Sequence, residues 1–121
     1  MAATAFYENV ARHRLEGREL DTDETQQNRV LQFAPGNGQL MLIACLWSRW
    51  SGPGQADVLS FAAITDEPLP EIQAAGHDRC IIPVKPGNVA TWLATPAPDA
   101  VDYEAILDDR ERRFYAHLLA A

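Results

Sequence analysis

The residues Leu40-Met41-Leu42-Ile43-Ala44-Cys45-Leu46-Trp47 form an eight-residue apolar run. A short apolar run between turn signals is typical of a buried strand. Just before it stands Pro35-Gly36-Asn37-Gly38, and Asn and Gly are the residues that best tolerate the positive φ of a tight turn. We therefore predict a strand over 28–34 that pairs, as a hairpin, with a long buried strand over 39–50.

Further short elements lie on both sides of this hairpin. Strands are predicted over 5–10, 58–65 and 80–84, the second of them buried, and 11–25 is predicted as a surface loop because it has no apolar period. Asp66-Glu67-Pro68 opens a predicted helix that Gly76 ends. Helices are also predicted over 86–94 and 101–107, and 95–121, which starts with a proline-rich linker, is predicted as a C-terminal helical tail.

The order of these elements predicts an α+β fold, with a mostly antiparallel, barrel-like mixed sheet and short flanking helices. The chain has 121 residues, of which 47% are hydrophobic, and this suits a single domain over 1–121. No apolar run reaches the length of a membrane-spanning helix, and residues 1–5 do not resemble a signal peptide. Two cysteines are too few for a disulfide scaffold, so a cytoplasmic location is expected.

The net charge of −7 argues against broad, sequence-blind adhesion to nucleic acid, which depends on Lys and Arg neutralising phosphates. A local basic patch can survive a negative total. Neither His13 nor His117 has a Cys or a pair of carboxylates at ligand spacing, so we predict no metal site and no cofactor.

Two titratable residues stand out. Glu8 lies inside the apolar strand-like stretch 5–10, and His77 lies between a predicted helix and an apolar strand. Histidine is the side chain most easily poised for proton transfer near neutral pH, so the two residues would form a general acid/base pair if the fold joins them. The alternatives are that Glu8 pairs with an arginine and that His77 is a loop histidine bonded to the backbone.

Other candidates have a plainer interpretation beside the functional one. Cys80 follows His77 by three residues, which permits a Cys-His hydrolase, but it enters an apolar strand and free cysteine is commonly a small buried hydrophobe. The same reasoning places Cys45 in the core. Three tryptophans are predicted as packing residues rather than platforms for stacked bases: Trp47, Trp50 and Trp92.

Five segments, in this order, resemble the SRAP family (SOS response-associated peptidase). Phe6-Tyr7-Glu8-Asn9 is similar to the family's Phe-Tyr-Glu-Trp strand, and His77-Asp78-Arg79 to its His-Asp-Arg-Met-Pro motif. The other three are Ala44-Cys45-Leu46-Trp47, Ser60-Phe61-Ala62-Ala63-Ile64-Thr65 and Trp92-Leu93.

The resemblance implies a protein of the DNA damage response that binds single-stranded DNA at abasic sites. In the family, an N-terminal cysteine attacks the ring-opened sugar aldehyde and closes a thiazolidine crosslink, while a glutamate and a histidine move protons. The matching positions here are Glu8 and His77. Autoproteolytic removal of the initiator Met gives the family its peptidase label. Three arginines that follow the Glu8 strand are our candidates for phosphate contacts: Arg12, Arg14 and Arg18.

The chain also departs from the family pattern. The family opens with Met-Cys-Gly-Arg, whereas position 2 here is Ala2, and the chain resembles the second half of such a protein. We therefore expect that the chain alone does not form the crosslink. It would then be a truncated product, one part of a split protein, or a remnant that keeps the fold without the chemistry. The alternative is a non-enzymatic binding or assembly module that is completed by self-association or by an N-terminal companion chain.

Overall fold

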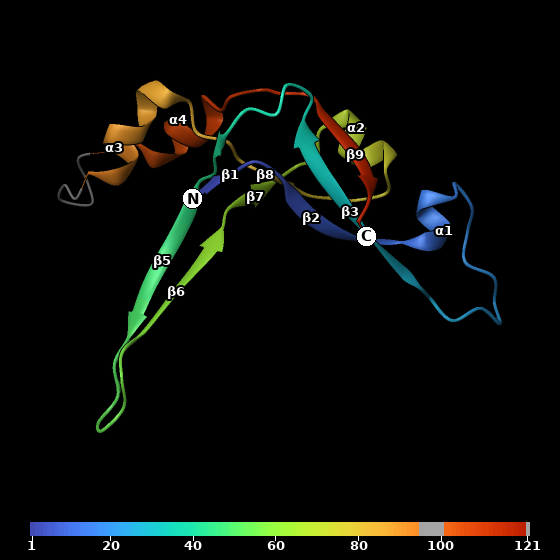
Figure 1. Cartoon of the computed structure of the whole chain (residues 1–121), viewed down its shortest axis with the longest axis horizontal. Coiled ribbons are helices and arrows are strands. Elements are labelled where there is room, and N and C mark those ends of the chain that lie inside the picture. The colour runs from blue at the N-terminus through green and yellow to red at the C-terminus, as the bar shows by residue number, and fades with distance from the viewer. Residues whose placement is uncertain (95–100, 121) are drawn as a thin grey trace.

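The computed structural model describes residues 1–94 and 101–120. An antiparallel three-stranded sheet forms its centre, in the order β2 (Phe6–Ala11), β3 (Asn28–Pro35) and β9 (Tyr115–Leu119). Figure 1 shows this sheet between α2 (Pro70–Ala74) on one side and the helices α3 (Val89–Leu93) and α4 (Tyr103–Asp108) further along the body. The α+β class and the mostly antiparallel pairing are confirmed.

The main core lies on one face of this sheet. Alternate residues of a strand project to the same face, and in β2 and β3 the alternating positions Phe6, Val10, Leu31 and Phe33 are buried. The Phe6 ring stacks on Phe33, with 5.3 Å between ring centroids, and meets the edge of Tyr115 at the same distance. Ile72 of α2 packs into the same cluster and is fully buried, which fixes α2 against the sheet.

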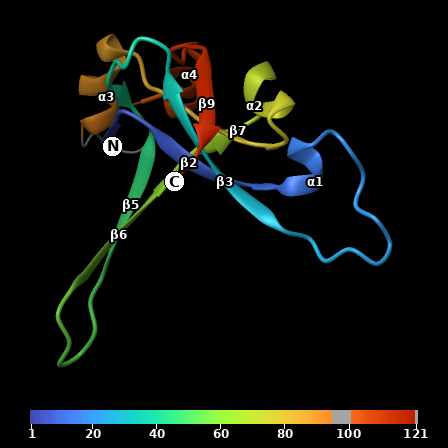
Figure 2. The ribbon, with the colours of Figure 1, turned by 45° about the vertical axis from the view of Figure 1, so that its right-hand side comes forward.

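The remaining strands form short two-stranded ladders. β1 (Ala2–Ala3) pairs with β4 (Met41–Leu42), β5 (Cys45–Trp50) with β6 (Val58–Ala63), and β7 (Thr65–Asp66) with β8 (Cys80–Ile81). Over residues 1–94 and 101–120 these ladders stay separate and do not close into a barrel. Figures 1 and 2 agree that β5 and β6 form an arm that projects away from the body.

The predicted hairpin of 28–34 with 39–50 is wrong. The strand β3 does form, but its two neighbours are β2 and β9, and the long apolar run is divided into β4 and β5. The break comes at Ile43 and Ala44, where Ile43 forms a bridge with Pro83 and the Ala44 N–H donates to the Ile82 carbonyl at 2.9 Å. Both side chains are buried there, so the run crosses the core and only then leaves the body.

The predicted burial of 45–50 and 58–65 is also wrong, because the side chains of β5 and β6 are mostly exposed. The predicted helical tail is observed for α4. The first turn of α4 is capped by the Asp102 carboxylate, which accepts a hydrogen bond from the Ala105 N–H at 2.9 Å. It is wrong for Tyr115–Leu119, which is strand β9, because the free edge of β3 offers backbone partners that a terminal helix would leave unpaired.

Three smaller predictions can be compared directly. The surface loop 11–25 contains one helical turn, α1 (Arg12–Leu15), while the predicted helix 86–94 is observed as a 3-10 turn, η1 (Pro86–Asn88), followed by α3. The predicted linker at 95–98 lies outside the described residues. None of the helices described in this structure is both long and apolar enough to cross a membrane.

Candidate acid/base site beside an open cavity

Strand β2 places Glu8 at the margin of the core. Glu8 projects to the same face as Phe6 and Val10, both buried, because the three residues alternate along the strand. Its side chain is 23% exposed, so the carboxylate reaches solvent while its stem lies among apolar groups. The predicted setting of a carboxylate in an apolar strand is therefore what the structure shows.

Gly76 brings the loop of His77 against this strand. Its φ is +91°, a left-handed conformation that ends α2, and its N–H donates to the Gln73 carbonyl at 2.9 Å. A Cβ at this position would lie 2.9 Å from Cβ of Arg14 and 3.0 Å from Cγ1 of Val10. Only a residue without a side chain allows this approach, so the glycine that stops the helix also sets the distance between the loop and β2.

Arg79 anchors the other end of the loop. Its guanidinium donates to the hydroxyl of Thr65 at 2.9 Å and to the Thr65 carbonyl at 3.0 Å. Thr65 belongs to β7, which pairs with β8 immediately after the loop. His77 is therefore held between a fixed helix end and a fixed strand.

Glu8 and His77 are in direct contact. Oε2 of Glu8 lies 3.2 Å from Nε2 of His77, and the His77 side chain is only 17% exposed. The two residues are far apart in the sequence, and the tertiary structure joins them as the sequence suggested. At this distance the two groups form an ion pair whenever the ring is protonated.

The other ring nitrogen of His77 has partners for two protonation states. Nδ1 lies 2.9 Å from the Arg79 carbonyl oxygen and 3.3 Å from the Arg79 backbone nitrogen. A neutral ring with its proton on Nε2 accepts from the Arg79 N–H, whereas an imidazolium donates to the carbonyl. The loop thus accommodates both the charged and the neutral ring, as a proton-transfer residue requires.

The pKa of Glu8 is raised above its usual value. Burial is the main cause, because it disfavours the charged carboxylate; the nearby His77 lowers the pKa in part, and the negative charge of Asp78 raises it. A carboxyl group with a raised pKa is a better proton donor near neutral pH than an ordinary glutamate.

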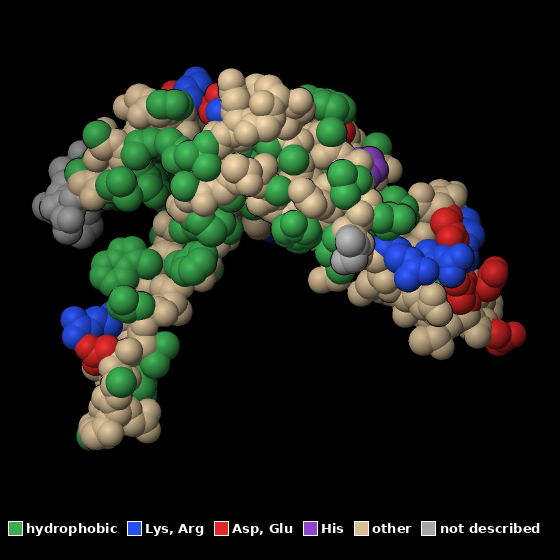
Figure 3. Space-filling model, in the orientation of Figure 1, with side chains coloured by type: hydrophobic (Ala, Val, Ile, Leu, Met, Phe, Trp, Pro, Cys, Tyr) green, Lys and Arg blue, Asp and Glu red, His purple; other side chains and the backbone are tan. Residues whose placement is uncertain are grey.

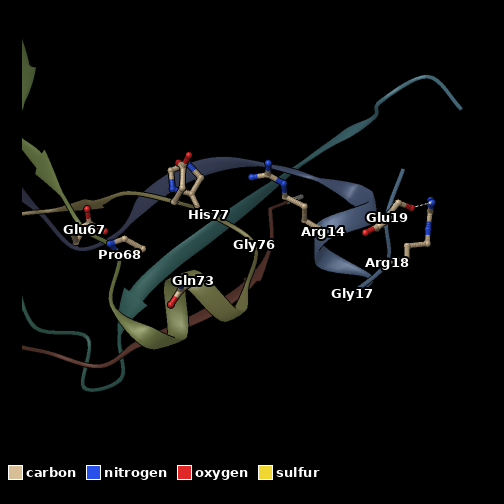
Figure 4. A pocket seen from close by; sticks show the side chains of 10 residues that line it. Arg14, Gly17, Arg18, Glu19, Glu67, Pro68, Gln73, Gly76 and His77 are labelled. Atoms are coloured by element: carbon tan, nitrogen blue, oxygen red, sulfur yellow. Dashed lines mark hydrogen bonds between the residues drawn. The ribbon is translucent and has the colours of Figure 1, made fainter. Parts of the chain in front are cut away.

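An open cavity of about 550 Å³ lies next to His77. Figure 4 shows Glu67 and Pro68 at one end of it, His77 and Gly76 in the middle, and Arg14, Arg18 and Glu19 at the other end. Gln73 reaches it from α2. The cavity offers two guanidinium groups, an amide, three carboxylates and an imidazole, so its wall is suited to a polar ligand.

The three candidate arginines differ in their surroundings. Arg12 pairs with Glu16 at 2.6 Å, and Arg18 pairs with Glu16 at 2.8 Å and with Glu24 at 2.6 Å. Arg14 is exposed and lines the cavity, and it makes no ion pair within residues 1–94 and 101–120. Of the three, Arg14 is therefore the one whose charge is free to meet an anion.

Cys80 does not have the properties of a nucleophile. Its side chain is buried, and burial raises the pKa of the thiol to about 11. A thiol with this pKa is protonated at neutral pH, whereas the thiolate is the reactive form. The structure thus favours the core interpretation of Cys80 over a Cys-His hydrolase.

Sequence reasoning missed two residues that position the site. It identified Gly76 as a helix stop but not as the point where the loop meets Val10 and Arg14, and it gave Arg79 no role. The contact of Gly76 depends on tertiary packing and leaves no local signal. The position of Arg79 in the His-Asp-Arg motif was a signal that pointed to it.

The fold and the site define a class of protein. The family model described as SOS response associated peptidase (SRAP) matches residues 1–118, so the chain belongs to the SRAP family. A solved X-ray structure of a protein from Bordetella bronchiseptica, a structural genomics target, is similar over the whole of this chain, with a TM-score of 0.64 and 20% sequence identity. The likeness shows a shared fold, and this chain spans 53% of that protein's length. No curated protein matches the chain.

Proposed function

We propose that this SRAP-family chain binds single-stranded DNA at abasic sites, through the cavity beside His77. The observation that carries the proposal is the 3.2 Å contact of Glu8 with His77, because His77 lines that cavity. Arg14 lines the cavity and makes no ion pair within residues 1–94 and 101–120, so it would be available to contact a phosphate. Arg12 and Arg18, tied to Glu16 and Glu24, would contribute less.

The pair would act on the sugar of the abasic site. Opening of the cyclic hemiacetal breaks the bond from the anomeric carbon to the ring oxygen, adds a proton to that oxygen and removes one from the anomeric hydroxyl. Glu8, with its raised pKa, would donate the first proton, and neutral His77 would accept the second. The product is the open-chain aldehyde.

We further propose that the chain alone does not form the family's thiazolidine crosslink. Ring closure needs a cysteine with a free α-amine, and both Cys45 and Cys80 are internal residues. The protonated, buried thiol of Cys80 also speaks against a simple thiol adduct. Incubation of the 121-residue chain with abasic single-stranded DNA tests this directly: a heat-stable adduct on a denaturing gel would refute it.

Binding is tested by fluorescence anisotropy with single-stranded oligonucleotides that differ only in one abasic site. Arg14→Gln should weaken binding and lower the slope of log K against log salt by about one, as expected for one lost phosphate contact. Arg29→Gln is the matched control, because Arg29 is exposed on β3 and does not line the cavity. Equal effects of both variants would contradict the proposed site.

The chemical role is tested by trapping the open-chain aldehyde with a hydroxylamine probe. Wild-type chain should speed trapping, and Glu8→Gln and His77→Gln should each remove the acceleration while oligonucleotide binding persists. Unchanged trapping in both variants would leave the protein as a DNA-binding module without acid/base chemistry.

A further inference from the structure

The β5–β6 arm (residues 45–63) carries an unusual amount of exposed apolar surface. Six large side chains on it are between 52% and 74% exposed: Leu46, Trp47, Trp50, Val58, Leu59 and Phe61. Figure 3 shows hydrophobic side chains (green) exposed along the projecting arm. Soluble monomers rarely expose a contiguous apolar surface of this kind unless it binds something.

The apolar side chains occupy both faces of the arm. The register pairs Trp47 with Phe61 and Trp50 with Val58 across the two strands. Alternate residues of a strand project to opposite faces, so Trp47, Leu59 and Phe61 share one face and Leu46, Trp50 and Val58 the other. A solvated two-stranded ribbon needs at most one apolar face, so at least one of these two faces is expected to be covered.

The edges of the arm are open as well. Within the described residues β5 pairs only with β6, and β6 only with β5. Each strand therefore presents a row of unpaired backbone N–H and C=O groups at its outer edge, which is a template for another strand.

The charge of the arm suits a second copy of the same chain. Residues 45–63 contain one cation and one anion, Arg49 and Asp57, and these two form an ion pair with each other. The arm is thus neutral, while the whole chain carries −7. Two copies that meet through their arms bring no like charges together, whereas contact through other surfaces would oppose two acidic bodies.

The size of the apolar surface fits a dimer. With aromatic side chains of roughly 200 Å² and aliphatic ones of roughly 110 Å², the observed exposures leave roughly 360 Å² of apolar surface on the face of Trp47, Leu59 and Phe61, and roughly 600 Å² on both faces together. A standard interface buries roughly 800 Å² per partner, of which somewhat more than half is apolar.

We propose that the β5–β6 arm is a dimerisation element that packs, about a two-fold axis, against the arm of a second copy of this chain. The face with Trp47, Leu59 and Phe61 forms the centre of the contact, because its side chains are the most exposed on average. The proposal does not depend on the acid/base role of Glu8 and His77, which lie in the body of the molecule.

Light scattering and sedimentation velocity over a concentration series test the proposal. The wild-type chain should show a discrete species of twice the 13.4 kDa monomer mass. Trp47→Ser and Phe61→Ser should each raise the dimer dissociation constant by about tenfold or more, as expected for aromatic residues at the centre of an interface. Phe114→Ser is the matched control, because Phe114 is 69% exposed outside the arm and should leave the constant unchanged.

Both substituted side chains project into solvent in the monomer, so near-ultraviolet circular dichroism should confirm that each variant folds. Leu46→Ser reports on the opposite face; if it alone disrupts the dimer, the assignment of the Trp47 face is wrong. A wild-type monomer at all concentrations, or growing aggregates without a discrete dimer, would overturn the proposal. The proposal would also be overturned by a chain that stays monomeric and whose arm tryptophan fluorescence is quenched only by single-stranded DNA. A monomer that binds only a separate companion polypeptide would overturn it as well.

Discussion

The substitution Gly76→Ala tests whether one glycine holds the His77 loop against the Glu8 strand. The residue has φ +91°, and an added Cβ would lie 2.9 Å from Cβ of Arg14 and 3.0 Å from Cγ1 of Val10. A non-glycine residue in left-handed backbone costs about 1–2 kcal/mol. Because Val10 is buried and both neighbours lie close to the backbone, relief of the contacts adds about 1 kcal/mol more.

We therefore expect Gly76→Ala to lower the free energy of unfolding by about 2–3 kcal/mol, measured by urea denaturation followed by circular dichroism. Two other glycines separate the causes. Gly38 has φ +64° in open space, so Gly38→Ala reports the backbone strain alone. Gly87 has neither a positive φ nor an atom within 4 Å of its Cβ position, so Gly87→Ala should be close to neutral.

The order of the three substitutions decides the result. If Gly76→Ala costs no more than Gly38→Ala, the close approach of the loop to Val10 and Arg14 is not as described, and the geometry of the Glu8–His77 pair loses its support. The same variant should also weaken the coupling of the two residues. In NMR titrations of the Glu8 carboxyl carbon, the pKa should return toward its usual value in Gly76→Ala, because the displaced loop no longer buries the carboxylate, and it should stay raised in Gly87→Ala.

Three further predictions concern the site, a helix cap and the thiols. Burial raises the pKa of Glu8 in the folded state, so the stability that the protonated side chain contributes is present at low pH and is lost as pH rises through the folded pKa. Between the ordinary and the raised pKa of Glu8, the Glu8→Gln variant should therefore gain stability relative to wild type. The gain is up to about 1.4 kcal/mol per pH unit and is measured by urea denaturation. A constant difference from pH 4 to pH 8 would refute this. Asp102→Ala removes the cap of α4 and should cost about 1 kcal/mol, while Asp23→Ala, in an exposed loop, should cost nothing measurable. Cys80 is buried and its thiol has a pKa of about 11, so it should react with a thiol reagent at pH 8 much more slowly than half-buried Cys45. The two rates are measured separately in the variants Cys45→Ser and Cys80→Ser, each of which keeps one thiol. Equal rates would contradict the burial of Cys80.

Local patterns in the sequence predicted most of the elements near the site. The apolar stretch around Glu8 indicated a strand that contains a carboxylate, and Gly76 indicated the end of a helix. These signals are readable because they depend on strand periodicity and on the backbone freedom of glycine, which are local properties. The ordered motifs then indicated the SRAP family, which the match over residues 1–118 confirms.

Pairing between distant segments was beyond what the sequence allows. The apolar run at 40–47 contains no sign that Ile43 and Ala44 bond to the segment around Pro83 while Leu46 and Trp47 project into solvent. A helix was predicted where β9 forms, because the pairing of this segment depends on the free edge of β3 and not on its own sequence. A short apolar segment takes the conformation that satisfies its backbone in context, so composition alone does not distinguish the two.

The sequence by itself determined the fold class and the family, and it identified Glu8 and His77 as candidates for an acid/base pair. The tertiary structure decided that Glu8 and His77 lie 3.2 Å apart, that Arg14 rather than Arg12 or Arg18 faces the cavity without a carboxylate partner, and that the arm exposes its apolar faces. The physical reason is that residue type and spacing set which side of an element a group occupies. Distances and exposure depend on which elements pack together. Here the close contact at Gly76 sets the position of the His77 loop, and the pairing of β3 with β2 and β9 sets the central sheet.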